Sequence, residues 1–389
     1  MILKTYMKRK FFTLVSINCF LSLGLVLQLY AQPEKAEAGI RTIMQQQAVA
    51  GLSVAVVKKG KIIYAHSFGM RDMENSLPLT NENLFRIASI SKSFSATAIM
   101  QLVEKKKLSL DDDVSNLIGF KVRNPKYPET VITLRNLMSH RSSLNDSQGY
   151  FTLDVINPEK NPDWAKCYSD YEPGKDYRYC NLNYNMVGTI IERVSGEKFD
   201  QYIKHHVLDP IGSYGGYCVD SLDKTRFANI YEYLVDSSKF RLSPGAYAPR
   251  SEDIAKYVMG YSTPIFSPTG GMKISATDLA KCMTMHMQMG RYKGKKIISK
   301  KSAKEMQEPI PGKENYGLAI ETSTKLIPGK TMKGHTGSAY GLYSIMYFQP
   351  KEKFGIVVIS NGCHPRYSDG FNTVLKQTVN CLYDNLIAN

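Results

Sequence analysis

The chain has 389 residues, of which 43% are hydrophobic and 22% charged, and its formal net charge is +15. This length is enough to bury a large core in one or two domains, and the composition excludes a wholly disordered chain. We find no basic-aromatic stripe or motif that would indicate a nucleic-acid partner. The positive charge fits a solvated surface, or attraction to an anionic cell-wall surface.

Residues 1–31 differ in composition from the rest of the chain. Four basic residues lie between positions 4 and 10, a mostly apolar run covers positions 11–30, and Ala31 follows. This order predicts a signal peptide that is cleaved after Ala31, and hence a protein exported across the inner membrane to the periplasm. An uncleaved membrane anchor is the alternative, because the run is long enough to span a bilayer. Cleavage would lower the net charge to +11, and no second run of membrane length follows.

Six cysteines remain after residue 31: Cys167, Cys180, Cys218, Cys282, Cys363 and Cys381. Export permits disulfides, but the sequence does not choose among the pairings. Cys167 and Cys180 form the most local candidate pair, whereas Cys282 lies in an apolar helical stretch that predicts a buried free thiol. No cysteine or histidine spacing indicates a metal site, and we expect no metal or organic cofactor.

Hydrophobic periodicity predicts strands near both ends of the chain and helices between them. The expected elements are a hairpin at 49–68, helices at 91–105, 133–140, 182–194 and 276–289, a hairpin at 341–360, and a closing helix at 370–387. We therefore expect one catalytic domain over residues 32–389, of mixed α/β (α+β) class. Its α/β half would use residues 45–110 and 271–389, and residues 111–270 would form an inserted, mostly helical half. The functional site would lie in the crevice between the halves.

The region from residue 142 to residue 176 reads as a long irregular loop. It contains Tyr150, Phe151 and Trp164, which is the only tryptophan in the chain. A long loop beside a crevice often determines specificity. These aromatic side chains could equally serve only to attach the loop to the domain.

The strongest chemical signal is Ser89-Ile90-Ser91-Lys92, at a predicted entry into a helix. Residues three apart on a helix share a face, so the Lys92 amine lies within reach of the Ser89 hydroxyl. A partly desolvated lysine is neutral often enough to take the proton of a serine nucleophile. The unpaired N–H groups at the helix start could stabilise an oxyanion.

Two further segments carry polar groups suited to the same crevice. In Tyr179-Cys180-Asn181, alternation in an extended chain would direct the tyrosine and asparagine to one side and the cysteine to the other. In the second segment, which runs from His335 to Ser338 and leads into a predicted strand, Gly337 would let a substrate backbone lie close to the strand.

Together these three motifs resemble the serine β-lactamase and penicillin-binding-protein superfamily, and in particular its class C branch. That branch also contains D,D-peptidases, D-aminopeptidases, esterases and acyltransferases. The resemblance covers about residues 45–385. It implies an antiparallel, β-lactamase-like sheet flanked by helices. Two departures occur: His335 stands where dedicated class C β-lactamases usually have lysine, and Cys180 stands where serine is common.

The resemblance implies a serine hydrolase that works through an acyl-serine intermediate on an amide, ester or β-lactam. Its catalytic residues would be Ser89, Lys92 and Tyr179, and its substrate-binding residues would be Asn181, His335, Thr336, Gly337 and Ser338. The departure at His335 favours a D,D-peptidase-like or esterase-like enzyme over a dedicated β-lactamase. The alternatives are an acyltransferase with a hydroxyl or amine acceptor, and a penicillin-binding sensor without turnover. The partner would be a small-molecule or peptide acyl donor, and the oligomeric state stays open.

Overall fold

The computed structural model describes residues 32–312 and 314–388. The predicted signal peptide lies outside these residues. Within them, no helix is both long enough and apolar enough to cross a bilayer.

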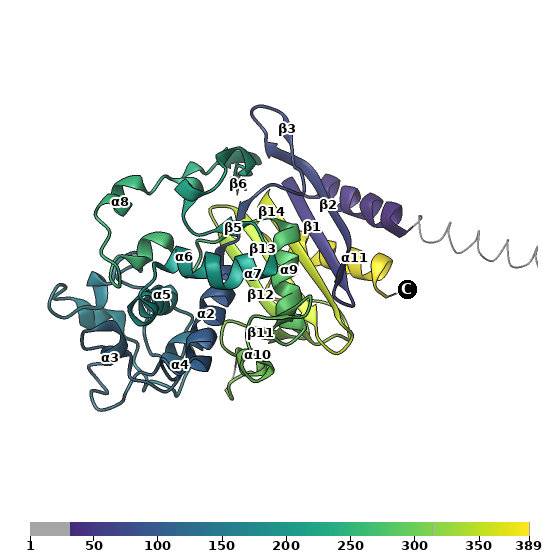
Figure 1. The fold of residues 1–389 in the computed structure, drawn as a ribbon. Coiled ribbons are helices and arrows are strands. Elements are labelled where there is room, and N and C mark those ends of the chain that lie inside the picture. The colour runs from purple at the N-terminus through teal and green to yellow at the C-terminus, as the bar shows by residue number, and fades with distance from the viewer. Residues whose placement is uncertain (1–31, 313, 389) are drawn as a thin grey trace, which may run out of the picture.

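A seven-stranded antiparallel sheet forms the centre of the fold (Figure 1). Its strands, in spatial order, are β11 (Glu321–Ser323), β12 (Met332–Ala339), β13 (Leu342–Gln349), β14 (Phe354–Cys363), β1 (Val49–Lys58), β2 (Lys61–Asp72) and β3 (Leu77–Pro78). Strands β1 and β14 are nearly continuous runs of buried residues, because helices cover both faces of the sheet there. The predicted α/β class with an antiparallel sheet built from both ends of the chain is confirmed.

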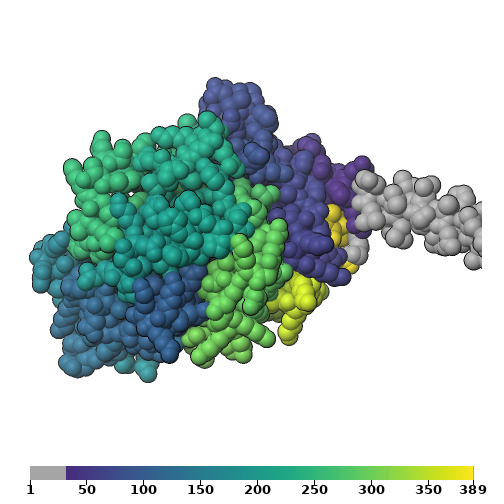
Figure 2. Space-filling view, viewed as in Figure 1, coloured from purple at the N-terminus to yellow at the C-terminus, as the bar shows by residue number. Residues whose placement is uncertain are grey.

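One face of the sheet is covered by a helix at residues 32–46 and by α11 (Thr373–Leu386), which share a core with β1 and β14. The other face carries α9 (Ala276–Met287), which packs on β1, β13 and β14, and the helical half beyond it. Figure 2 shows the two halves packed closely against each other on the face in view.

The segment predicted as the helical half, residues 111–270, contains α5 (Asn181–Ser195), which packs against α2 (Lys92–Glu104) from the preceding segment. Residues on all sides of α2 are buried, as expected of a helix in the middle of a core. The remaining α-helices are α3 (Val114–Ile118), α4 (Leu134–Met138), α6 (Phe199–Ile203), α7 (Asp209–Ile211), α8 (Ser251–Ala255) and α10 (Lys300–Gln307), with a π-helix, η4, at Lys204–Leu208.

Short elements complete the fold. The 3-10 turns are η1 (Ala88–Ser91), η2 (Asp154–Ile156), η3 (Trp164–Cys167), η5 (Val219–Ser221), η6 (Lys224–Arg226), η7 (Pro244–Tyr247) and η8 (Thr263–Phe266). Small sheets are formed by β4 (Phe85–Arg86), β8 (Lys273–Ile274) and β5 (Gly215–Gly216), by β6 (Tyr231–Leu234) and β7 (Lys239–Leu242), by β9 (Arg291–Tyr292) and β10 (Lys295–Lys296), and by β15 (Tyr367–Ser368) and β16 (Phe371–Asn372).

The predicted hairpins and helices are confirmed within a few residues at their ends. The sequence analysis missed the helix at residues 32–46. Cys167 and Cys180, the most local candidate pair among the pairings that the sequence left open, form no disulfide, because the six described cysteines are free. The Cys180 thiol instead lies 3.2 Å from Asp146 Oδ1. The predicted buried thiol of Cys282 is confirmed.

Gly337 allows β12 to pack closely against the segment that leads into α2. A Cβ atom at this position would overlap with the carbonyl oxygen of Ile87 and the hydroxyl of Ser344. The absence of a side chain at Gly337 is therefore needed for packing within the protein. The predicted approach of a substrate backbone to Gly337 stays a prediction.

The substitution Gly337→Ala is expected to destabilise the fold by about 1–3 kcal/mol, because overpacking against backbone cannot be relieved by a side-chain rotation. Urea unfolding measures this change. Gly216→Ala is the control, since its Cβ would meet nothing nearer than Leu222 at 3.6 Å and should change the stability by less than about 0.5 kcal/mol. Equal effects of the two substitutions would contradict the packing role.

Candidate active site

Ser89 lies in the 3-10 turn η1, directly before the buried helix α2, and lines a cavity of about 500 Å³. The chain reaches it from β4 through Ala88, whose φ of 50° lies in the left-handed region. This conformation costs a residue with a Cβ atom about 1–2 kcal/mol. Such strain persists only where the surrounding structure fixes it, and it is common at functional sites.

Lys92 is the first residue of α2 and has no exposed surface. Its Nζ atom lies 3.1 Å from Ser89 Oγ, 3.1 Å from Asn181 Oδ1 and 3.0 Å from the carbonyl oxygen of Thr269. The structure therefore joins the first two motifs around one amine.

These three partners orient the amine when it is neutral. Asn181 Oδ1 and the Thr269 carbonyl can only accept hydrogen bonds, and they take both N–H groups of a neutral amine. The nitrogen lone pair is then left for the third partner, the Ser89 hydroxyl. In that state Ser89 donates its proton toward Lys92, which is the geometry that a general base requires.

The electrostatic environment favours this neutral state. Burial lowers the pKa of Lys92 from 10.5 to about 7, and the negative charge of Asp146 opposes the shift. Lys92 can thus exchange a proton near neutral pH.

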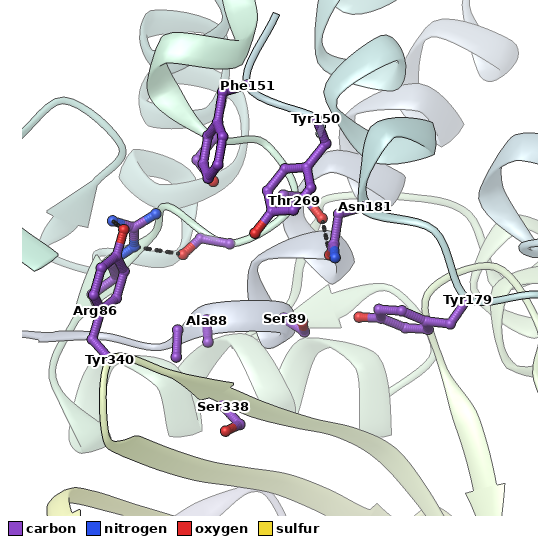
Figure 3. Close-up of a pocket in the computed structure, with 13 residues that line it drawn as sticks. Arg86, Ala88, Ser89, Tyr150, Phe151, Tyr179, Asn181, Thr269, Ser338 and Tyr340 are labelled. Atoms are coloured by element: carbon purple, nitrogen blue, oxygen red, sulfur yellow. Dashed lines mark hydrogen bonds between the residues drawn. The ribbon is translucent and has the colours of Figure 1, made fainter. Parts of the chain in front are cut away.

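Tyr179 faces Ser89 from the other side of the cavity (Figure 3). Its ring centroid lies 4.7 Å from Lys92 Nζ. Tyr179 as a whole residue is 37% exposed, but desolvation of its hydroxyl raises the pKa of Tyr179 well above its ordinary value. The hydroxyl therefore keeps its proton at neutral pH.

His140 supports the ring of Tyr179 from behind. It is fully buried, and its ring centroid lies 4.2 Å from that of Tyr179. The N–H of Cys180 donates to His140 Nδ1 at 3.2 Å, so this nitrogen is the unprotonated one. Burial keeps the pKa of His140 well below its ordinary value, which makes the ring a neutral support.

Asn181 is oriented by Asp146, which the sequence analysis did not single out. Asp146 accepts from the Asn181 side-chain amide at 3.0 Å and from the backbone N–H groups of Asn181 and Leu182 at 2.8 and 3.0 Å. It thereby caps α5 from a distant loop, while Cys180 at the N-cap position gives no side-chain cap. Because a carboxylate only accepts, Asn181 Oδ1 must face Lys92.

Thr269 was also not predicted from the sequence. Its hydroxyl donates to Asn181 Oδ1 at 2.9 Å, and its carbonyl accepts from Lys92. No spacing rule connects it with the motif at Ser89.

The residues of the third motif have different surroundings. The His335 ring centroid lies 6.3 Å from that of Tyr179, Thr336 lines a different cavity, and Ser338 lines the Ser89 cavity. The carbonyl of Thr336 accepts from His335 Nδ1 at 2.6 Å, and the Tyr316 hydroxyl lies 2.9 Å from Nε2. Both ring nitrogens thus have partners within the protein, and the structure does not bring His335 or Thr336 to the cavity wall.

His335 carries no charge at neutral pH. Burial, followed by the nearby charge of Lys92, lowers its pKa to about 3. A lysine at this position would place a cation near the cavity, whereas the neutral imidazole does not. Tyr316, the partner of His335, lies in a loop that no sequence signal connected with the site.

The wall of the cavity is partly aromatic. Tyr150 and Phe151 reach it from the long loop at residues 142–176, and Tyr340 reaches it from the turn after β12 (Figure 3). The residues that line it are Arg86, Ala88, Ser89, Tyr150, Phe151, Tyr179, Asn181, Ser267, Thr269, Gly270, Ser338, Ala339 and Tyr340.

Residues 32–312 and 314–388 contain no cluster of side chains suited to a metal ion. The adjacent His205 and His206 lie on the π-helix, where His206 Nε2 is 2.9 Å from a carboxylate oxygen of Glu197. Both histidines therefore contact the carboxylate of Glu197 at the surface.

A family model described as Beta-lactamase matches residues 36–378. Protein flp of Staphylococcus aureus strain MW2 is 24% identical over 334 residues, which cover 82% of this chain and 61% of that protein. Penicillin-binding protein 4* of Bacillus subtilis strain 168 is 29% identical over 228 residues, which cover 56% of this chain and 43% of that protein. The chain thus spans at most about three fifths of the length of these relatives.

Solved structures give the same result for the fold. An octameric penicillin-binding protein homologue from Pyrococcus abyssi has a TM-score of 0.69 and 28% identity, over 90% of this chain and 78% of that one. EstCE1, a hydrolase with promiscuous acyltransferase activity, has a TM-score of 0.72 and 20% identity, over 92% and 100%. A D-amino acid amidase from Ochrobactrum anthropi SV3 has a TM-score of 0.68 and 22% identity, over 90% of this chain and 98% of that one.

The rate at which a fluorophosphonate labels Ser89 is expected to rise with pH through a midpoint near 7, because only neutral Lys92 can take the serine proton. In Asp146→Asn the midpoint should move to lower pH, since the carboxylate that favours charged Lys92 is gone. Mass spectrometry of the labelled protein measures the rates.

Asp154→Asn is the control for this experiment, because Asp154 is a carboxylate on the same loop that pairs with Lys160. Its midpoint should equal that of the wild type. A wild-type midpoint near pH 10.5, or a midpoint that moves to higher pH in Asp146→Asn, would contradict the role of neutral Lys92 as the base for Ser89.

Proposed function

The chain belongs to the Beta-lactamase family, and we propose that it is a serine hydrolase that acts through an acyl-serine intermediate formed on Ser89. The observation that supports this most directly is the buried Lys92 amine, which lies 3.1 Å from Ser89 Oγ and has a pKa of about 7.

In the first step the Ser89 oxygen attacks the carbonyl carbon of the acyl donor, and its proton passes to Lys92 Nζ. The tetrahedral intermediate carries a negative charge on the former carbonyl oxygen. By analogy with the family, the backbone N–H groups of Ser89 and Ser338 stabilise this oxyanion, and both residues line the cavity.

Collapse of the intermediate breaks the bond to the leaving oxygen or nitrogen, which takes a proton from Tyr179. The raised pKa of Tyr179 supports the role of proton donor, because the hydroxyl is protonated when the step begins. Lys92 then returns its proton to Tyr179, directly or through water. Water attacks the acyl-serine in the second step, and the same residues act in reverse.

The donor is an amide, an ester or a β-lactam, and the enzyme is D,D-peptidase-like or esterase-like more than a dedicated β-lactamase. Neutral His335 supports this preference, since it provides no cation for the carboxylate that a penicillin carries on its leaving side. Asn181, which lines the cavity, would contact an amide of the substrate. Acyl transfer to an alcohol or amine differs only in the second step, and EstCE1, a hydrolase with promiscuous acyltransferase activity, shares the fold.

We further propose export to the periplasm after cleavage of residues 1–31. The basic and apolar pattern of that segment supports this location. A net charge of +11 after cleavage is compatible with attraction to an anionic cell-wall surface.

Incubation of the mature protein with an activated ester, a D-Ala-D-Ala peptide and a penicillin is expected to give an acyl adduct or product with at least one donor. Ser89→Ala should lower the rate by about 10³-fold or more, since no other group replaces the nucleophile. Intact-mass spectrometry detects the adduct. Ser93→Ala is the control, because the Ser93 hydroxyl donates to the Ile90 carbonyl and not to the cavity. This variant should react at the wild-type rate.

Product formation that survives in Ser89→Ala would refute the assignment of the nucleophile. An adduct of one equivalent without turnover would point to a sensor. Product formed only when an alcohol or amine is added would point to an acyltransferase.

Replacing His335 by lysine is expected to raise kcat/KM for benzylpenicillin relative to p-nitrophenyl acetate by about tenfold. A cation near the cavity would form a charge-assisted hydrogen bond with the penicillin carboxylate. Steady-state kinetics gives the ratio. His205→Lys adds a charge to an exposed residue and should leave the ratio as it is. An unchanged ratio in His335→Lys would show that the charge at this position does not limit β-lactam hydrolysis.

A further inference from the structure

We propose that the acyl group of the substrate carries a carboxylate, and that Arg86 binds this group in the cavity beside Ser89. The inference rests on the proposed function, because it takes Ser89 as the nucleophile. It concerns the acyl portion of the donor, about which the three motifs carry no information.

Arg86 is a buried cation that pairs with no carboxylate in the part of the chain that the structure describes. Only 7% of its surface is exposed. Its Nε–H donates to the Gly270 carbonyl at 3.1 Å, and Nη1 donates to the Ala246 carbonyl at 3.4 Å and to the Tyr340 hydroxyl at 3.5 Å. A buried charge without a counter-ion is costly, so its presence in a cavity wall indicates a ligand of opposite charge.

Two further basic residues, Lys273 and Arg250, lie near Arg86. Lys273 is 4% exposed and its Nζ donates to the Tyr217 carbonyl. Burial, and then the charge of Arg86, lower the pKa of Lys273, while Arg250 contributes to lowering the pKa of Arg86. Asp220 is the carboxylate that favours charged Lys273, and it does not line the cavity. Arg86 therefore has basic neighbours but no carboxylate partner among the described residues.

The wall of the cavity contains no aspartate or glutamate. An acyl donor with an ammonium group, such as a free amino acid amide, would find no counter-charge there. A carboxylate would gain a bidentate partner in the guanidinium group.

The position of Arg86 assigns the charge to the acyl side of the substrate. Arg86 and Tyr340 lie on one side of Ser89, and Tyr179, the proposed donor to the leaving group, lies on the other (Figure 3). The Tyr340 ring lies 4.9 Å from the guanidinium carbon. It is held there by a tight turn in which Tyr340 and Gly341 have φ values of 59° and 97°. A short hydrocarbon linker would pass between the rings of Tyr340, Tyr150 and Phe151.

Three esters with one leaving group test the inference: mono-p-nitrophenyl adipate, p-nitrophenyl hexanoate and p-nitrophenyl 6-aminohexanoate. Their acyl chains have six carbons and end in a negative, a neutral and a positive group. The wild type, after subtraction of the Ser89→Ala rate, should show a kcat/KM for the adipate that exceeds the hexanoate value by about tenfold. The 6-aminohexanoate should be the poorest substrate.

Arg86→Gln should bring the ratio of adipate to hexanoate close to one, and Arg86→Lys should retain part of it. Arg41→Gln removes an exposed arginine from the helix at residues 32–46 and should keep the wild-type ratio. Circular dichroism checks that each variant folds. If Arg86→Gln does not fold, the wild-type ranking and Arg86→Lys decide.

A wild type that prefers the hexanoate or the 6-aminohexanoate would overturn the inference, as would a folded Arg86→Gln with the wild-type ratio. Those results would leave the proposed function standing. Absence of Ser89-dependent turnover with all three esters would overturn both.

Discussion

The hydrogen bond from the Asn181 side chain to Asp146 determines the arrangement of the site. It fixes which end of the amide faces Lys92, and the same carboxylate caps the helix that begins at Asn181. If the Asn181 amide were reversed, its NH₂ group would face the Lys92 amine, which is also a donor. Lys92 would then lose one of the two acceptors that direct its lone pair toward Ser89. One carboxylate behind the cavity thus controls a helix start, an amide orientation and the direction of a proton transfer.

The parts that the sequence predicted well depend on local patterns. The hairpin around Lys58, the helix after Ser91 and the closing helix follow from periodicities within a few turns or one strand pair. The motifs at Ser89 and Tyr179 also read correctly as neighbours in space, because their spacing belongs to a known family. The alternation that sends Cys180 away from the cavity holds even though Asn181 begins a helix rather than continuing a strand.

The parts that the sequence did not predict depend on contacts between distant segments. Asp146, Thr269 and Tyr316 reach the site from separate loops, and no spacing rule relates them to Ser89. The four consecutive residues from His335 to Ser338 were all predicted to bind substrate, but successive residues of a strand face opposite sides. The thiols illustrate the same limit, since Cys167 and Cys180 are close in sequence but form no disulfide.

Strand β14 lies between β13 and β1, and Val49 pairs with Cys363. During translation the hairpin of β1 and β2 therefore leaves the ribosome long before β14, the strand that pairs with β1, has been synthesised. The cavity gains Ser338 and Tyr340 only when the late strands dock. A nascent chain consequently carries Ser89 without the groups that complete the cavity, and the complete cavity can form only after the last strands have been synthesised and paired.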